Sequence, residues 1–181
     1  HRKDSPAMTA VVLPDGRYLA SGNLDRTITV FEWQDNRPSR NPWVMSGFPG
    51  KVRHLAWSPL LANHSNPLLA SASVEGIVIW ERDINPFLGW KERVLESHRQ
   101  TVAAIAFQPQ TQHLASAGAD GLVSLWQNAQ RLTYKLTSAS QGFSCLSWHP
   151  QGTSLAAGGS EGELLVWSQT LSGKGFAKQI N

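Results

Sequence analysis

Short apolar runs separated by turn signals recur along the chain and predict strands. The clearest example is the stretch 98–126, in which VAAIAF at 102–107 stops just before Pro109. Proline leaves part of a β-ladder without a donor, so this run is expected to be a strand that ends there. HLASA and LVSLW follow as two further strand-length runs, and Asp120-Gly121 between them is the dipeptide that a tight hairpin turn prefers. The stretch therefore predicts a small antiparallel meander.

The same arrangement recurs in three other parts of the chain. Each copy has a proline after its first strand, a Leu-Ala pair in its second strand, an acidic turn, and an aromatic residue ending its third strand. The prolines are Pro14, Pro59, Pro109 and Pro150, the turn residues are Asp25, Glu75, Asp120 and Glu161, and the aromatics are Phe31, Trp80, Trp126 and Trp167. The prolines lie 45, 50 and 41 residues apart, close to the period of about 40 to 45 that marks four-stranded propeller blades.

On these residues the sequence resembles the WD-repeat family of β-propellers. The literal Trp-Asp pair is absent from all four copies, whose closing dipeptides are Phe31-Glu32, Trp80-Glu81, Trp126-Gln127 and Trp167-Ser168. The resemblance implies an all-β propeller of four blades, each with four antiparallel strands, that forms half of a ring. The expected blades of this single propeller segment, 1–181, are 1–47, 48–97, 98–138 and 139–181.

The resemblance also implies a buried chain of hydrogen bonds in the third copy. In that chain an indole donates to a hydroxyl, the hydroxyl to an imidazole, and the imidazole to a carboxylate. The residues that match this structural tetrad are His98, Ser116, Asp120 and Trp126. The first copy has His1, Ser21 and Asp25 but ends in Phe31, the second has Ser71 and Trp80 without the histidine, and the fourth has Ala157 in place of the serine. The third blade is therefore expected to be the most rigid.

Outer strands and insertions complete the expected blades. The outer strands are expected at 43–46, 131–137 and 175–180. The polar insertion 34–42 is expected to be a loop, and two further insertions lie at 60–67 and 83–90. The topology of an antiparallel meander brings all three insertions to one end of the first two blades. They carry residues with the composition of interface hot spots, namely Arg37, Arg40, Phe87 and Trp90. The alternative is that Phe87 and Trp90 fold back onto their own blade.

The opposite end of the blades is the one that family members most often use to hold peptides or proteins. The residues expected to line its central mouth are Met8, Leu24, Lys51, Arg53, Val74 and Ala119. Lys51 and Arg53 favour an acidic segment of a partner, although single charges of this kind are equally consistent with ordinary solvated residues.

Composition narrows the class of partner and the compartment. Charged residues make up 16% of the 181 residues, the net charge is +3, and Lys and Arg are scattered, so a nucleic-acid partner is not expected. The single cysteine, Cys145, permits no internal disulfide, which favours a cytoplasmic location, and a buried inert thiol is its simplest account. The chain contains no apolar run of about 20 residues, so membrane association is not expected.

Several residue patterns resemble known catalytic motifs. His98, Ser116 and Asp120 form a Ser/His/Asp set, but a catalytic triad needs an exposed nucleophile and this serine belongs to a core strand. The stretch 158–162 matches a nucleophile elbow, yet ELLVW after it predicts a strand where that motif needs a helix. The six histidines lack the spacing of a zinc site, and there is no glycine-rich phosphate loop. No catalytic residue, metal site or cofactor is therefore predicted.

The sequence favours a non-catalytic scaffold that presents loops in a fixed geometry to a protein or peptide partner. A second hypothesis is a self-assembling half-propeller, because the first and last blades each leave an apolar face to be covered. A homo-dimer would cover both faces and complete a ring of eight blades, and further blades would serve equally. An enzyme and a nucleic-acid-binding propeller remain as weaker alternatives. Because the chain has no initiator methionine, it is expected to be a fragment, a processed product or an excised piece of a longer protein.

Overall fold

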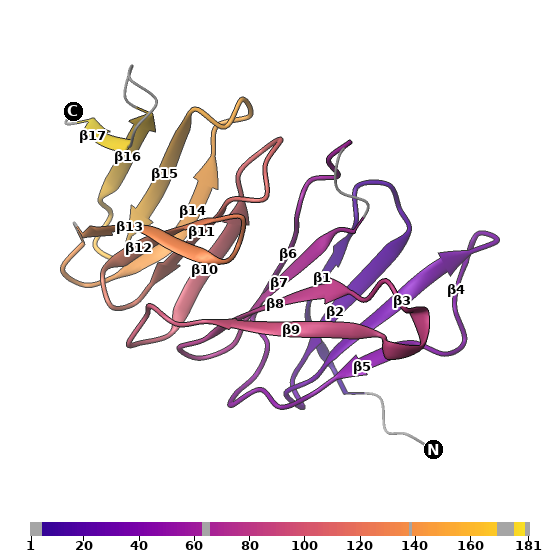
Figure 1. Cartoon of the computed structure of the whole chain (residues 1–181). Coiled ribbons are helices and arrows are strands. Elements are labelled where there is room, and N and C mark those ends of the chain that lie inside the picture. Colours follow the sequence, from indigo (N-terminus) through magenta and orange to yellow (C-terminus); the bar gives the residue numbers. More distant parts are fainter. Residues whose placement is uncertain (1–4, 63–65, 138, 170–175, 180–181) are drawn as a thin grey trace. The chain divides into compact units, whose positions relative to one another are not determined.

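A computed structural model describes residues 5–62, 66–137, 139–169 and 176–179. Within these residues the chain is all-β apart from one short 3-10 helix, and its strands form four antiparallel sheets (Figure 1). The chain divides into two compact units, His1–Glu96 (unit 1) and Ser97–Asn181 (unit 2), each of which contains two sheets. The predicted all-β fold is confirmed.

The first sheet of unit 1 has five strands rather than four. They are β1 (Ala7–Val12), β2 (Tyr18–Asn23), β3 (Ile28–Gln34), β4 (Arg37–Pro38) and β5 (Trp43–Met45). Both β4 and β5 pair with β3, so the prediction of a plain loop at 34–42 is wrong at 37–38. The reason lies in Asp35 and Asn36, whose φ angles are 47° and 61°. Asp and Asn tolerate this left-handed conformation, which closes a tight β3–β4 hairpin.

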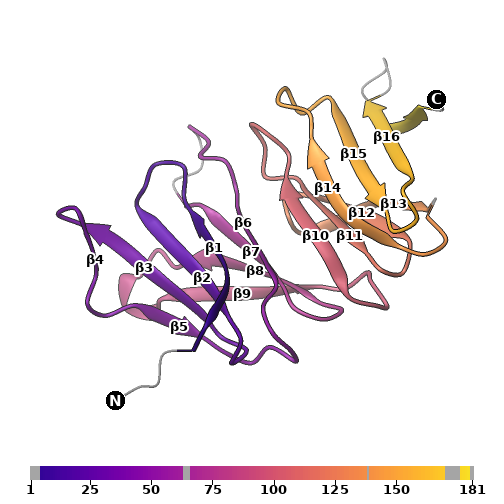
Figure 2. The same ribbon diagram turned by 180° about the vertical axis from the view of Figure 1, so that it is seen from behind.

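The second sheet of unit 1 contains the long insertion of the second copy. Its strands are β6 (His54–Trp57), β7 (Leu68–Ala72), β8 (Ile77–Arg82) and β9 (Trp90–Leu95), in that order, and the 3-10 helix η1 (Pro86–Leu88) lies between β8 and β9. The two sheets of unit 1 pack face to face (Figure 2). Alternate residues such as Ala20 and Val30 on one sheet and Leu69 and Trp80 on the other enter their shared core.

Unit 2 contains two four-stranded meanders. One consists of β10 (Val102–Phe107), β11 (Leu114–Gly118), β12 (Leu122–Gln127) and β13 (Arg131–Thr137), and the other of β14 (Phe143–Trp148), β15 (Ser154–Gly159), β16 (Leu164–Gln169) and β17 (Phe176–Gln179). The outer strands predicted at 131–137 and 175–180 are thereby confirmed. The core between the sheets includes Val123 and Leu125 from β12 and Leu155 and Trp167 from the last meander.

In each unit, a tryptophan at the end of an inner strand forms a hydrogen bond between the two sheets. The indole Nε1 of Trp57 donates to the carbonyl of Val11 at 3.3 Å, and that of Trp148 donates to the carbonyl of Ala106 at 3.2 Å. These bonds join β6 to β1 and β14 to β10. The same contact therefore recurs in both units, and the pattern of strands and turns in the sequence does not reveal it.

Candidate functional site

A chain of side-chain hydrogen bonds runs through the β10–β13 sheet. Trp126 Nε1 donates to Ser116 Oγ at 3.1 Å, Ser116 Oγ lies 2.9 Å from His98 Nε2, and His98 Nδ1 lies 3.1 Å from Asp120 Oδ1. Ser116 and Trp126 come from β11 and β12, and Asp120 lies in the turn between these strands. A carboxylate only accepts, so Nδ1 carries the imidazole proton, and in the neutral ring Nε2 accepts from the serine hydroxyl.

Asp120 is also held by the backbone around it. Its oxygens accept hydrogen bonds from the amides of Arg99 at 2.8 Å and Leu122 at 3.2 Å. Burial opposes ionisation, but these bonds and the one from His98 outweigh it and lower the pKa of Asp120. A Cβ at Gly118 would lie 2.5 Å from both Asp120 Oδ1 and His98 Nδ1. Glycine is therefore required for the two side chains to approach across this strand.

This set of residues does not have the geometry of a catalytic triad. Ser116 is 0% exposed and His98 is buried, whereas a nucleophile must reach its substrate. The 158–162 stretch joins β15 to the strand β16 and not to a helix. Across the part of the chain that the structure describes, no group of three or more His, Cys, Asp and Glu residues could hold a metal ion. The hydrogen-bonded set therefore lies within the packed core, away from the surface.

The equivalent positions in unit 1 are bonded differently. In the β6–β9 sheet Trp80 Nε1 donates to Ser71 Oγ at 3.0 Å. The Ser71 hydroxyl donates to the carbonyl of Val78, whereas the Ser116 hydroxyl bonds to a histidine. In the first sheet Ser21 Oγ donates to Asn23 Oδ1 at 2.7 Å. Asn23 in turn donates to Thr27 and Thr29, and His1 lies outside the described residues. An asparagine therefore links the polar groups of the first sheet.

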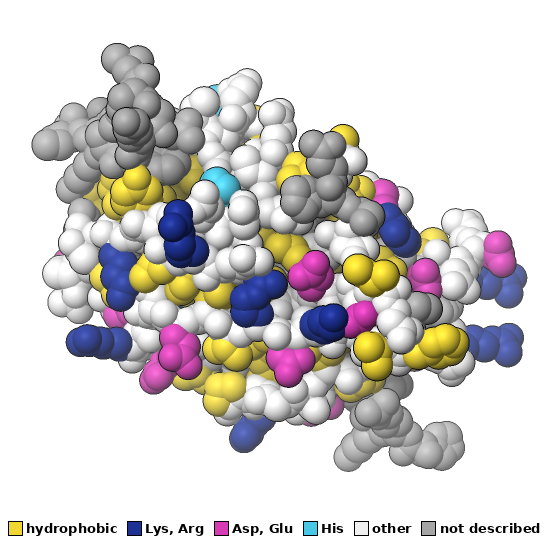
Figure 3. All heavy atoms as spheres, viewed as in Figure 1, with side chains coloured by type: hydrophobic (Ala, Val, Ile, Leu, Met, Phe, Trp, Pro, Cys, Tyr) yellow, Lys and Arg dark blue, Asp and Glu magenta, His cyan; other side chains and the backbone are white. Residues whose placement is uncertain are grey.

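The loop between β8 and β9 (83–89, the β8–β9 loop) exposes three large apolar side chains. Ile84, Phe87 and Leu88 are 93%, 95% and 65% exposed, and Figure 3 shows hydrophobic atoms at the surface of this part of unit 1. Large apolar side chains gathered on one exposed segment are typical of an interaction surface. Of these three residues, only Phe87 was predicted from the sequence, although the run INPFL within an insertion was a signal for all three.

Polar contacts at the base of the β8–β9 loop hold it in one conformation. Asp83 Oδ1 accepts from the Asn85 amide at 2.7 Å, and Asn85 Oδ1 caps η1 by accepting from the Phe87 amide at 3.1 Å. Arg82 donates to the Gly89 carbonyl at 2.6 Å. Lys91 Nζ lies 2.6 Å from Asp83 Oδ2, and its ammonium lowers the pKa of this carboxyl group. The exposed apolar residues therefore project from an ordered loop.

Trp90 lies beside this loop but is buried, and it makes edge or tilted ring contacts with Tyr18, Trp43 and Trp57. The ring of Trp90 packs against the first sheet, so Trp90 is not exposed on the loop as Phe87 is. Phe87 does not fold back. Asn66 of the 60–67 insertion lies close to this loop, because its Nδ2 donates to the Arg82 carbonyl at 3.1 Å. The Arg82 guanidinium lies over the ring of Trp43 in β5.

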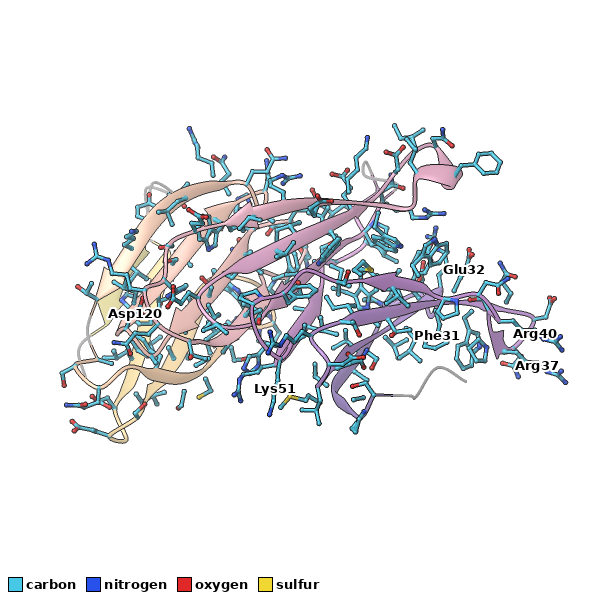
Figure 4. The ribbon with its side chains drawn as sticks, turned by 90° about the horizontal axis from the view of Figure 1, so that it is seen from below. Phe31, Glu32, Arg37, Arg40, Lys51 and Asp120 are labelled. Atoms are coloured by element: carbon cyan, nitrogen blue, oxygen red, sulfur yellow. The ribbon has the colours of Figure 1, made fainter. Side chains whose placement is uncertain are left out.

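Charged residues of the two predicted surfaces lie in separate parts of unit 1. Arg37 and Arg40 are exposed together at one end, and Lys51 lies away from them (Figure 4). Of the residues predicted at the central mouth, those exposed in unit 1 are Met8, Leu24, Lys51, Arg53 and Val74. The amide of Leu24 donates to Pro6, next to the start of β1. Ala119 belongs to unit 2, where it is half-buried and its amide donates to Thr101.

Cys145 does not fit its predicted environment. It is exposed, not buried. On β14 it pairs with Gly158 of β15, and its side chain belongs to the face of the last sheet that no other described sheet of unit 2 covers. In the part of the chain that the structure describes, no helix is long and apolar enough to span a membrane.

Comparison with known proteins gives a consistent family signal. The family model described as "WD domain, G-beta repeat" matches residues 1–32, 89–127 and 130–168, more than half of the chain. Protein hir-1 of Neurospora crassa is 29% identical over 131 residues, which are 63% of this chain and 12% of that protein. Protein CIA1 of Arabidopsis thaliana is 34% identical over 88 residues, which are 46% of this chain and 25% of that protein.

Structural similarity extends further along the chain than sequence similarity. A chain in the crystal structure of the Mitotic Checkpoint Complex superposes with a TM-score of 0.73 at 20% identity, and the match covers 97% of this chain and 52% of that one. At this identity the likeness concerns the fold. The present chain spans about half of that solved chain, and a smaller fraction of the curated relatives.

Proposed function

Because the chain belongs to the WD-repeat family of β-propellers, we propose that it is a non-catalytic scaffold that binds a protein or peptide partner through the β8–β9 loop. One observation carries this proposal: three large apolar side chains, those of Ile84, Phe87 and Leu88, are exposed on an internally hydrogen-bonded loop. Fully burying one such side chain is worth about 1.5 to 3 kcal/mol. Since the loop is already ordered, less of this gain is lost to fixing its conformation.

We propose that two exposed arginines of unit 1 extend this surface. Arg37 and Arg40 are exposed on the insertion of the first copy, and arginine beside an aromatic anchor is a common composition at the centre of interfaces. A partner that fits this surface has an apolar pocket for Phe87 and acidic groups at its rim. The opposite end of unit 1, with Lys51 and Arg53, is a second place at which an acidic partner segment is proposed to bind.

Affinity capture with matched variants tests which surface is used. We expect Phe87→Ser to lose a partner that the unchanged protein and a Lys51→Glu, Arg53→Glu variant both retain. Partners would be identified by mass spectrometry, and circular dichroism would establish that each variant is folded. Retention by Phe87→Ser together with loss by the double variant would move the site to the opposite end. Retention by both variants would contradict binding at either surface.

A second candidate function, self-assembly, is favoured by the burial of equivalent positions. In the β6–β9 sheet Leu69, Ser71 and Trp80 are buried, whereas their counterparts Leu19, Ser21 and Phe31 on the first sheet are half-buried. At the other end of the chain, Ala115, Ala117 and Val123 in the β10–β13 sheet are buried, and their counterparts on the last sheet are Ala156, Gly158 and Leu164. Leu164 is 73% exposed.

The exposed faces of the first and last sheets are formed by positions equivalent to those that are buried on the β6–β9 and β10–β13 sheets. A head-to-tail pair of copies would therefore place the last sheet of each copy on the first sheet of the other and complete a ring of eight blades. Light scattering on a sizing column is expected to give the mass of a dimer, and Leu164→Asp to give a monomer. Ile84→Asp, the same type of change at another exposed position, should leave the dimer intact. A monomeric unchanged chain would contradict self-assembly.

A reducing compartment, the cytoplasm, is the proposed location. Cys145 is an unpaired and exposed thiol, and exposed free thiols are better preserved where the environment is reducing. Fluorescence microscopy of the tagged protein tests this, and accumulation in the secretory pathway would contradict it.

A further inference from the structure

Unit 1 contains a groove whose lining includes no residue of the β8–β9 loop. It has a volume of about 580 Å³, within the range of about 300 to 1,000 Å³ that is usual for ligand sites. One side is formed by the β8 and β9 residues Val78, Trp80, Glu92 and Val94, and the other by β5 and the following 46–50 loop. Figure 1 shows β5 running beside β9. The groove is thus a gap between the outer parts of two sheets.

The groove exists because the two outer strands differ in length. β5 has three residues and β9 has six. After β5 the chain turns away at Gly47, whose φ is +100°, and its Gly50 amide is fixed by a 3.1 Å hydrogen bond to Ser73 Oγ. The far half of β9 therefore lacks a covering strand. Val94 is 56% exposed there although it faces the apolar groove.

The groove combines apolar surface with one carboxylate. Glu92 pairs with Trp80 and Val94 with Val78 across the β8–β9 ladder, so Glu92 and Val94 occupy the same face two residues apart, about 6 to 7 Å along the strand. The flanking cations bind other carboxylates, with Lys91 at 2.6 Å from Asp83 and Arg93 at 3.5 Å from Glu81. Among the described residues Glu92 has no ion-pair partner.

The backbone beside the groove can also take part in binding. Within the described residues β5 is hydrogen-bonded to β3 alone, so its second edge offers free amides and carbonyls to an added strand. An extended peptide that pairs with such an edge directs every second side chain to the same face. The spacing of Glu92 and Val94 then matches two alternate side chains of that peptide.

We propose that this groove binds an extended segment of another protein in which a Lys or Arg and a large apolar residue are two positions apart. The basic side chain pairs with Glu92, and the apolar one lies against Val78, Val94 and Phe48. This goes beyond binding at the β8–β9 loop, because it assigns a second surface and the sequence character of its ligand.

Fluorescence anisotropy with short labelled peptides, measured on the full chain, tests the proposal. A peptide with a central Lys-Thr-Leu is expected to bind at least about tenfold more tightly than the same peptide with Glu-Thr-Leu or Lys-Thr-Ser. Glu92→Lys should reverse the preference between the Lys and Glu peptides, and Val94→Asp should weaken both. A reversed preference is a readout that simple unfolding of the variant would not produce.

Two control variants separate this site from general charge effects and from the β8–β9 loop. Glu96→Lys makes the same change in charge at an exposed position just after β9 and outside the groove lining, and it should leave peptide binding unchanged. Phe87→Ser should also leave it unchanged, so failure of one proposal does not imply failure of the other. Equal affinity for the three peptides, or equal weakening by Glu92→Lys and Glu96→Lys, would overturn the proposal.

Discussion

The β10–β13 sheet and the β1–β5 sheet are built from the same repeat but stabilised in different ways. In the former, Trp126, Ser116, His98 and Asp120 form one hydrogen-bonded chain from the third strand to the turn. In the latter, Phe31 cannot donate, and Asn23 links Ser21 to two threonines. The β1–β5 sheet therefore has the strands of the repeat although it lacks the hydrogen-bonded chain of the β10–β13 sheet. The repeat determines the meander, and the side-chain network determines how much stability one position contributes.

The equivalent serines of the two sheets are expected to contribute different amounts of stability because they differ in burial. Ser116 is completely buried and has two partners, whereas Ser21 is half-buried and has one. Removing one member of a buried pair leaves the other without a partner and without water, which costs more than the net value of the bond. Substitutions at equivalent serines should therefore have graded effects.

The largest effect is expected from Ser116→Ala. It leaves the Trp126 indole N–H and the His98 imidazole without their shared partner in a buried site, and each such group costs about 1 to 3 kcal/mol. We expect the free energy of unfolding of unit 2 to fall by about 2 to 4 kcal/mol, measured by urea denaturation followed by tryptophan fluorescence. Ser21→Ala is the matched control and should cost about 1 kcal/mol or less. Equal losses would show that the network adds nothing.

Ser71→Ala should have an intermediate effect. Ser71 is buried like Ser116, but among the side chains of the described residues its one hydrogen-bond partner is Trp80. The substitution leaves one buried indole N–H unsatisfied, so we expect a loss of about 1 to 2 kcal/mol in the free energy of unfolding of unit 1. Hydrogen exchange of β7 and β8 amides would measure it locally. A loss as large as that of Ser116→Ala would contradict the importance of the histidine in the third sheet.

A pH dependence should distinguish the β10–β13 sheet at acidic pH. The pKa of Asp120 is lowered in the folded protein, so its carboxylate stabilises the fold above its unfolded pKa of about 3.9 and loses this contribution as the pH falls through the folded value. The effect is smaller than that of either serine, because protonation weakens these bonds without removing the acceptor. Unfolding curves between neutral and acidic pH should show a shallower decline for Asp120→Asn. An unchanged decline would show that other carboxylates cause it.

The smallest effect is expected from Phe31→Trp, which adds the missing donor to the first sheet. Phe31 pairs with Leu19 as Trp126 pairs with Leu114, so the new indole N–H would reach Ser21. One neutral hydrogen bond should stabilise unit 1 by about 0.5 to 1 kcal/mol. Thermal unfolding of Phe31→Trp with and without Ser21→Ala measures the coupling. If the gain persisted without the serine, it would come from apolar contact and not from the hydrogen bond.

The repeat itself was readable because its signals are local. Proline at the ends of inner strands, an acidic turn and a closing aromatic residue indicate where the first three strands of each copy start and stop. The outer strands β13 and β17 were expected separately, in the segments that follow the closing aromatic residue. Local chemistry also explains the one error in the first sheet. Asp35-Asn36 is itself a turn-forming pair, and it forms a hairpin turn although it lies within a polar stretch typical of a loop.

The sequence by itself determined the all-β repeat, the positions of its strands and turns, and the loops able to carry a binding surface. Only the tertiary structure decided which side chains those surfaces expose. Phe87 and Trp90 lie three residues apart, yet Trp90 packs against Tyr18 and Trp57 while Phe87 remains exposed. Cys145 is exposed because no described sheet of unit 2 covers its face. Periodicity gives the face to which a side chain belongs, but burial depends on whether another sheet covers that face.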